Sequence, residues 1–201
     1  MPYQPVNQRA RIRILQAGGL LLAASLLMMH PALTGDGNEV IEVISLALVL
    51  ACVGGRMWSI LYIGSKKNRE LVTAGPYSMT RNPLYFFSML GAVGIGLFVG
   101  SLTLALLLGG AVYLVLVITA EKEARHLEAL FGAQYRDYAR RTPMFWPKPS
   151  LYREAGDVAF SPVALRRTFF DGLLFFAAFP AIEAIEYLRE VGYLPILFEL
   201  P

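Results

Sequence analysis

Residues 71–87 read LVTAGPYSMTRNPLYFF, and they combine several side chains that can bind a charged ligand. A Gly-Pro-Tyr sequence is typical of a turn, and the Asn of Arg-Asn-Pro is biased away from helical backbone. An arginine can hold a carboxylate through two parallel hydrogen bonds, and a tyrosine ring can face a cation. Arg81, Tyr77 and Tyr85 therefore make this stretch a candidate binding site. A well-made loop between two helices is the alternative interpretation.

The elements that must position this stretch are apolar. The chain of 201 residues is 56% hydrophobic and 16% charged, whereas an average soluble domain is about 25% charged. The mean hydropathy is +0.51. This length fits one domain. The composition predicts an all-α, polytopic integral membrane protein that forms a single membrane domain over residues 1–201.

Apolar runs of about 20 residues are long enough to cross a bilayer. The run at residues 84–118 is too long for one crossing, and the sequence VGSLT at 99–103 supplies a break within it. We therefore expect five transmembrane helices, at about residues 14–33, 40–63, 84–100, 102–120 and 168–188.

Two polar segments separate these helices. Residues 64–83 form a loop after the second helix. Residues 121–141 follow the fourth helix, and their apolar side chains recur at helical spacing with charges between them. This pattern predicts an amphipathic helix at 121–141 that lies near the membrane surface. A site built between the two segments would lie at one membrane face.

Lysine and arginine are concentrated at one side of the predicted helices. Arg9, Arg11 and Arg13 precede the first helix, and both polar segments are rich in basic residues. The loop after the first helix contains Asp36 and Glu39 but no basic residue. Since basic loops stay in the cytoplasm, we expect the N-terminus and the site to be cytoplasmic. A bacterial inner membrane is the predicted location, and the lipid bilayer is the first predicted partner.

Other function classes receive little support. The net charge is only +3 and no DNA- or RNA-reading motif is present, so no nucleic-acid partner is expected. A single cysteine, Cys52, excludes an intrachain disulfide. With only His30 and His126 beside that thiol, we predict no metal site. The oligomeric state stays open.

Two motifs resemble the membrane methyltransferases typified by isoprenylcysteine carboxyl methyltransferase, which are related to phospholipid methyltransferases. Residues 70–87 resemble the family pattern of Leu-Val, a Gly-x-Tyr turn and Arg-His-Pro-x-Tyr. The second motif follows in the family's order and comprises Glu123, Leu127, Phe131, Gly132, Tyr135 and Tyr138. The resemblance covers about residues 56–147.

The resemblance implies S-adenosylmethionine as the methyl donor, bound without a Rossmann domain. Within this cofactor, Arg81 suits the carboxylate, Glu123 the ammonium or ribose, and Tyr77 and Tyr85 the sulfonium or the adenine. The candidate catalytic residues are Arg81, Asn82, Tyr85 and Glu123. The implied cofactor contacts are Tyr62, Arg69, Glu70, Leu71, Val72, Tyr77, Arg81, Asn82, Pro83, Leu84 and Glu123.

The sequence departs from the family pattern at two informative positions. Asn82 stands where the family has histidine, and an amide can form hydrogen bonds but cannot titrate near neutral pH. Thr119 stands where the prenylcysteine-methylating enzyme has a substrate-contacting arginine. The acceptor is therefore open among amphiphilic or apolar molecules: an isoprenoid-like carboxylate or thiol, or a lipid amine.

Two other functions compete with this interpretation. A sterol-type, NADPH-dependent membrane reductase carries a similar Arg-His-Pro-x-Tyr element, and binding of the reduced nicotinamide would identify it. A non-catalytic membrane scaffold would tolerate alanine throughout the loop at 64–83.

The apolar helices contain two further features. The glycines of residues 91–100, GAVGIGLFVG, follow no predicted strand, so they indicate close helix packing rather than a dinucleotide loop. Arg56 and Trp58 lie near the end of the helix predicted at 40–63. We expect both to face the cytoplasmic interface, with Arg56 extending its charge toward water.

Overall fold

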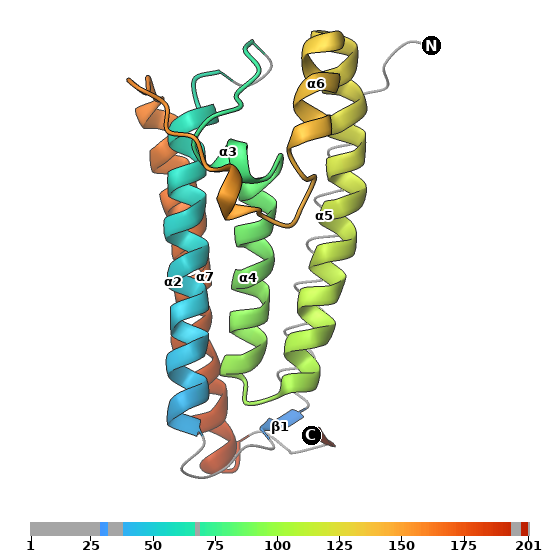
Figure 1. The fold of residues 1–201 in the computed structure, drawn as a ribbon. Coiled ribbons are helices and arrows are strands. Elements are labelled where there is room, and N and C mark those ends of the chain that lie inside the picture. The colour runs from blue at the N-terminus through green and yellow to red at the C-terminus, as the bar shows by residue number, and fades with distance from the viewer. Residues whose placement is uncertain (1–28, 32–37, 67–68, 194–197, 201) are drawn as a thin grey trace.

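The computed structural model describes residues 29–31, 38–66, 69–193 and 198–200. Four long helices lie side by side (Figure 1), and they are α2 (Asn38–Ile63), α4 (Pro83–Phe98), α5 (Leu102–Phe131) and α7 (Pro162–Glu190). The short helices α3 (Pro76–Met79) and α6 (Ala133–Arg141) lie with the 3-10 helix η1 (Pro149–Leu151) near one end of the bundle. We call residues 69–82 and 132–158, which contain these short elements, the polar cap.

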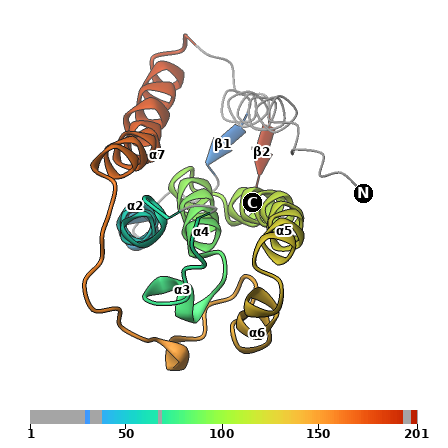
Figure 2. The same cartoon turned by 90° about the horizontal axis from the view of Figure 1, so that it is seen from above.

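Three of the described helices are long and apolar enough to cross a membrane, namely those at Glu39–Ile63, Leu102–Phe131 and Pro162–Ile185. The predicted span at 168–188 lies within α7. Helix α4 has 16 residues and is therefore only about 24 Å long. It lies between α2 and α5 (Figure 2). These helices agree with an integral membrane protein, and the count of five spans stays a prediction.

The helix predicted at 14–33 is wrong at its C-terminal end. Met29–Pro31 form strand β1, which pairs in parallel with β2 (Phe198–Leu200). Pro31 supplies no backbone N–H and disfavours helical backbone at the residue before it. Residues 14–28 and 32–33 lie outside the described residues.

The boundary predicted between helices 102–120 and 121–141 is also wrong. Helix α5 continues from Leu102 to Phe131 and ends at Gly132, whose φ of +54° lies in a region that favours glycine. Between residues 120 and 131, alanine, glutamate, lysine, arginine and leucine all favour a helix. The polarity of the chain therefore changes while the helix continues. That residues 121–141 lie at a membrane surface stays a prediction.

Helix α4 packs closely on both of its neighbours through glycine. Gly91 and Gly94 lie against α2, where the Ser45 hydroxyl donates a hydrogen bond of 2.8 Å to the Gly94 carbonyl. On another side, Gly96 lies against the backbone of Ala105 in α5. The close packing predicted from these glycines is thus confirmed.

The end of the bundle opposite the polar cap has a small hydrophobic core. Val99, Leu104 and Ile182 are buried there and bring α4, α5 and α7 together. The rings of Phe98 and Phe179 have their centres 4.1 Å apart. This core and the α2–α4 contact hold the long helices that carry the polar cap.

Candidate functional site

Two stretches far apart in the sequence lie side by side in the polar cap, residues 75–82 and residues 143–153. The Thr80 side chain, only 1% exposed, donates a hydrogen bond of 2.9 Å to the Phe145 carbonyl. Three backbone hydrogen bonds also join the stretches: Gly75 N–H to the Arg153 carbonyl (2.8 Å), Arg81 N–H to the Pro143 carbonyl (2.9 Å) and Lys148 N–H to the Met79 carbonyl (3.0 Å). These bonds fix the Gly-Pro-Tyr turn and the start of α4.

Gly75 allows this turn to lie directly against the end of α2. Its φ is +59°, which a residue with a side chain rarely adopts. A Cβ atom at this position would collide with the ring of Tyr62. Pro76 then occupies the first position of α3, where a missing N–H costs nothing.

Among the aromatic residues predicted to contact the cofactor, Tyr77 is the most deeply buried. Its side chain is 5% exposed, and its buried hydroxyl has no hydrogen-bond partner among the described residues. Burial raises the pKa of Tyr77 well above its usual value, and the nearby Tyr138, Glu123 and Tyr85 raise that pKa further. These interactions bring Glu123 of α5 and Tyr85 of α4 into the surroundings of the Tyr77 hydroxyl.

Arg81 joins the same cluster from the start of α4. Its Nη1 donates a hydrogen bond of 3.2 Å to the Tyr135 hydroxyl, while its buried Nε has no partner among the described residues. The Tyr138 hydroxyl donates a hydrogen bond of 2.7 Å to the Tyr77 carbonyl. Burial raises the pKa of Tyr138, and the Arg81 charge opposes that rise. Motif residues from α3, α4, α5 and α6 therefore meet in one place.

The remaining residues of the Arg-Asn-Pro-Leu sequence contact the protein itself. Asn82 Nδ2 donates a hydrogen bond of 2.9 Å to the Met144 carbonyl. Pro83 is buried at the first position of α4, and Leu84 is half-buried. These contacts give the three residues a part in holding the cap, and their catalytic or cofactor roles stay predictions.

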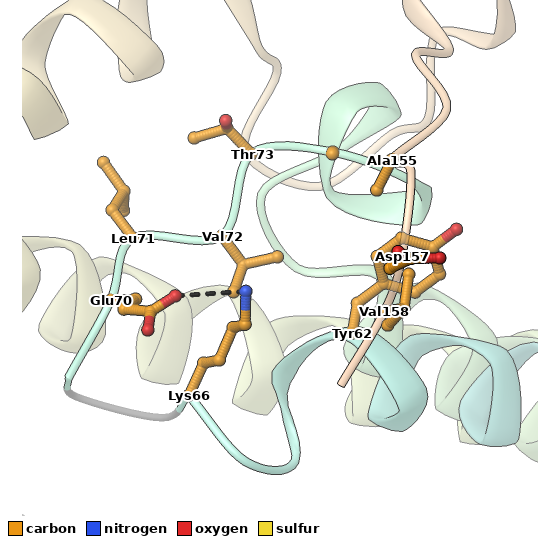
Figure 3. A pocket seen from close by; sticks show the side chains of 10 residues that line it. Tyr62, Lys66, Glu70, Leu71, Val72, Thr73, Ala155, Asp157 and Val158 are labelled. Carbon is orange, nitrogen blue, oxygen red and sulfur yellow. Dashed lines mark ion pairs between the residues drawn. The ribbon is translucent and has the colours of Figure 1, made fainter. Parts of the chain in front are cut away.

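A pocket of about 200 Å³ lies beside this cluster, between the end of α2 and the segment at 155–158 (Figure 3). An ion pair of 3.0 Å between Lys66 and Glu70 lies at its edge. Its other lining residues are Tyr62, Leu71, Val72, Thr73, Ala74, Ala155, Asp157 and Val158. The pocket thus combines an aromatic ring, apolar side chains and a few charged groups.

Seven of the eleven predicted cofactor residues fall into two neighbouring groups. Four of them line the pocket, namely Tyr62, Glu70, Leu71 and Val72. The second group comprises Tyr77, Arg81 and Glu123 with the candidate catalytic Tyr85. Glu123 and Tyr85 lie near the Tyr77 hydroxyl, and Arg81 lies near Tyr135 and Tyr138. Gly75 connects the groups, since it follows residues 71–74 and touches Tyr62. Arg69 is exposed and is not among the lining residues.

Sequence reasoning missed the contribution of residues 153–158. The Arg153 amide donates a hydrogen bond of 2.9 Å to the Ser78 hydroxyl, and Ala155, Asp157 and Val158 line the pocket. These positions lie beyond the stretch with family resemblance, and no sequence pattern indicated them. They reach the site because residues 143–153 fold back onto the Gly-Pro-Tyr turn.

Comparison with known proteins identifies a family whose pattern spans both motifs. The pattern of the phospholipid methyltransferase family matches residues 40–134. This range contains most of α2 and all of α3, α4 and α5, and it includes Tyr62, Tyr77, Arg81 and Glu123. No solved structure matches the chain.

Two curated relatives carry names that concern metal resistance. The "Nickel-cobalt-cadmium resistance protein NccN" of Alcaligenes xylosoxydans xylosoxydans is 38% identical over 156 residues, which cover 78% of this chain and 72% of the relative. The "Cobalt-zinc-cadmium resistance protein CzcN" of Cupriavidus metallidurans is 34% identical over 190 residues, which cover 92% of this chain and 86% of the relative. The similarity to both relatives thus extends over most of their length.

Proposed function

Because this chain belongs to the phospholipid methyltransferase family, we propose that it transfers a methyl group from S-adenosylmethionine to an amphiphilic or apolar acceptor in the membrane. One observation carries the proposal. Within the family motif, the Tyr77 hydroxyl and the Arg81 Nε are both buried and both lack a hydrogen-bond partner among the described residues. A ligand with acceptor atoms would satisfy both donors.

The residues of this cluster fit S-adenosylmethionine. Buried polar atoms in folded proteins are nearly always hydrogen-bonded, so two unpartnered donors within one motif favour a bound molecule. Arg81 can hold the carboxylate of the methionine part, because a guanidinium forms strong hydrogen bonds with carboxylates. Glu123 is half-buried and can hold the ammonium. The rings of Tyr77 and Tyr85 can face the sulfonium cation.

The pocket beside the cluster suits the other end of the cofactor. Ligand sites usually enclose about 300–1,000 Å³, and this pocket of about 200 Å³ is large enough for only part of such a ligand. Tyr62 offers an aromatic face, and Leu71 and Val72 offer apolar contacts. We assign the adenosine to this pocket and the methionine to the tyrosine cluster.

Methyl transfer requires mainly that the protein positions the two reactants. S-adenosylmethionine supplies a methyl group on a positively charged sulfur, and transfer breaks that C–S bond while a bond to the acceptor nucleophile forms. The raised pKa of Tyr77 keeps its hydroxyl protonated at neutral pH, so Tyr77 donates hydrogen bonds and does not remove a proton. The chain's contribution is then orientation of the two reactants and exclusion of water. A carboxylate or thiolate acceptor suits such a site.

The distribution of charge supports a cytoplasmic position for the polar cap. Residues 132–158 contain five arginine and lysine residues, namely Arg136, Arg140, Arg141, Lys148 and Arg153, whereas the first turn of α2 at the other end contains Glu39. Basic segments stay on the inner side of bacterial membranes. We therefore place the site at the cytoplasmic face of an inner membrane.

The names of the relatives raise the question of metal binding. Among the residues that the structure describes, no group of three or more histidine, cysteine, aspartate or glutamate side chains could hold a metal ion. We propose that a contribution of this chain to metal resistance would come from methylation of a membrane component. Growth of a deletion strain on nickel, cobalt or cadmium, with and without the E123Q variant, tests this link.

The first experiment is calorimetric binding of S-adenosylmethionine to the detergent-purified chain. Glu123→Gln removes a charge beside Tyr77 and keeps the size of the side chain, so we expect about tenfold weaker binding, in line with the loss of one charge-assisted hydrogen bond. Glu121→Gln is the matched control, because Glu121 is an exposed glutamate on the same helix. The control variant should bind like the unaltered protein.

The outcomes separate this proposal from its competitors. Equal affinity in both glutamine variants would contradict the role of Glu123. Binding of NADPH in place of S-adenosylmethionine would favour a membrane reductase. A folded protein that binds neither molecule would favour a scaffold.

A further inference from the structure

Arg56 places a positive charge inside the helix bundle. It precedes the end of α2 at Ile63 by seven residues, and it therefore lies about 10 Å below that end. Its Nη1 donates a hydrogen bond to the Ser88 hydroxyl of α4, and its Cζ lies 6.0 Å from the centre of the Phe175 ring of α7. The predicted extension of this side chain toward water is thus wrong. Trp58, in contrast, contacts Tyr152 of the polar cap.

This charge has no counter-charge in the described part of the chain. The ion pairs found there lie elsewhere, in the loop after α2 and around α6. The Arg56 Nε is buried and lacks a hydrogen-bond partner among the described residues, although the side chain as a whole is only half-buried. A guanidinium carries five N–H donors. A charged residue inside a membrane span is costly and usually marks a site with a partner.

We propose that Arg56 binds the phosphate or carboxylate of an amphiphile that enters from the bilayer. Arginine suits either anion, because its planar fork matches their oxygen atoms. The accessible part of Arg56 belongs to a helix long and apolar enough to cross the membrane, so the ligand comes from the lipid phase. The hydroxyl of Ser88 and the ring of Phe175 form two walls of this anion site.

The position of this anion site indicates which role the bound amphiphile has in the reaction. Ser88 follows the candidate catalytic Tyr85 by three residues on α4, which is about 4.5 Å along the helix axis. An amphiphile held at Arg56 would therefore lie within one helical turn of the methyl-transfer site. It follows that the methyl acceptor is an anionic amphiphile, a step that rests on the proposed function.

Binding of a defined probe tests the anion site without any methyl transfer. The full chain in a non-ionic detergent is titrated with dodecyl phosphate, dodecanoate and inorganic phosphate by calorimetry. We expect saturable binding of the two amphiphiles and at least tenfold weaker binding of inorganic phosphate. Arg56→Met should weaken amphiphile binding at least tenfold. Arg140→Met, which removes an exposed arginine of α6, should leave it unchanged.

A second variant keeps the test sharp if Arg56→Met fails to fold. Ser88→Asp places a carboxylate where the Ser88 hydroxyl now meets Arg56, so it should raise the thermal midpoint and abolish probe binding. Unchanged probe affinity in folded Arg56→Met or Ser88→Asp protein would overturn the proposal, as would equally tight binding of inorganic phosphate. Titration of the same samples with S-adenosylmethionine separates a failure of the anion site from a failure of the proposed function.

Discussion

The helix bundle and the polar cap are stabilised by different interactions. In the bundle, α4 approaches α2 and α5 at glycines, and the contacts are mostly between apolar side chains. In the cap, buried polar side chains bond to carbonyls far away in the sequence, as Tyr138 does to Tyr77 and Asn82 does to Met144. The bundle therefore depends on shape, and the cap depends on individual hydrogen bonds.

This difference explains where a binding site can form. Three buried side-chain atoms lack a hydrogen-bond partner among the described residues, and two of them, the Tyr77 hydroxyl and the Arg81 Nε, belong to the cap or its junction with α4. The third belongs to Arg56, at the level where α2, α4 and α7 meet below the cap. In a close-packed protein, buried donors nearly always have a hydrogen-bond partner. Each of these unpartnered atoms therefore marks a place where a ligand can bind. The comparison can be tested by disturbing one region at a time.

The largest effect is expected from Gly96→Val in the bundle. A Cβ at Gly96 would meet the backbone of Ala105, and backbone cannot move aside as a flexible side chain can. Overpacking of this kind costs about 1–3 kcal/mol or more. Thermal unfolding in detergent should show a clearly lowered midpoint, and ligand binding should be lost together with the fold.

Gly110→Val is the matched control for this change. Gly110 lies on α5 and is exposed, and within the part of the chain that the structure describes no atom lies within 4 Å of its Cβ position. Its substitution should change stability by no more than about 0.5 kcal/mol. Similar midpoints for the two valine variants would show that close packing at Gly96 does not hold the bundle together.

A smaller and more local effect is expected from Gly75→Ala in the cap. The substitution adds backbone strain of about 1–3 kcal/mol and forces the turn away from the Tyr62 ring. Since Gly75 connects the pocket to the tyrosine cluster, binding of S-adenosylmethionine should weaken by about tenfold or more. Calorimetry measures the affinity, and hydrogen exchange of residues 71–82 measures the opening of the turn.

Gly132→Ala separates strain from collision. Gly132 has a similar positive φ of +54°, but no atom of the described residues lies within 4 Å of its Cβ position. This variant should lose stability through backbone strain alone, and therefore by less than Gly75→Ala, and it should keep its affinity for the cofactor. If both variants lost affinity equally, the contact between Gly75 and Tyr62 would have no special importance for the site.

The long helices could be predicted from the sequence because each of them contains a long run of apolar residues. Apolar runs indicated α2, α4 and α7, and the glycines of residues 91–100 indicated the close packing of α4. The tyrosines, Arg81 and Glu123 were recognised from their motif, and the structure brings them together. Their roles in binding and catalysis stay predictions.

The errors arose where polarity and structure do not change together. Helix α5 continues for eleven residues after Ala120, because a helix leaving the apolar layer needs no break in its backbone. The direction of Arg56 depends on Ser88 and Phe175, which are distant in the sequence. The same holds for residues 155–158 of the pocket. Local patterns contain no information about such partners.

The smallest expected effect is a difference in how the polar cap and the helix bundle respond to high pH. Burial raises the pKa values of Tyr77 and Tyr138 above the value of about 10 for an exposed tyrosine. A group with a raised pKa in the folded state stabilises that state fully below its unfolded pKa and loses this contribution as the pH rises. The cap should therefore open progressively above about pH 10, while α2 and α4 keep their protection. Hydrogen exchange followed by mass spectrometry measures both regions in one sample.

Tyr138→Phe identifies the hydroxyl responsible for part of this alkaline opening. The variant loses the hydrogen bond of 2.7 Å to the Tyr77 carbonyl, which should cost the cap about 1 kcal/mol near neutral pH. It also removes one titrating group, so the further loss above pH 10 should be smaller than in the unaltered chain. The peptides of α2 and α4 serve as the internal reference. If they lost protection at the same pH as residues 71–82 and 143–153, cap and bundle would unfold as one unit, and the distinction between shape and hydrogen bonding would not extend to their stabilities.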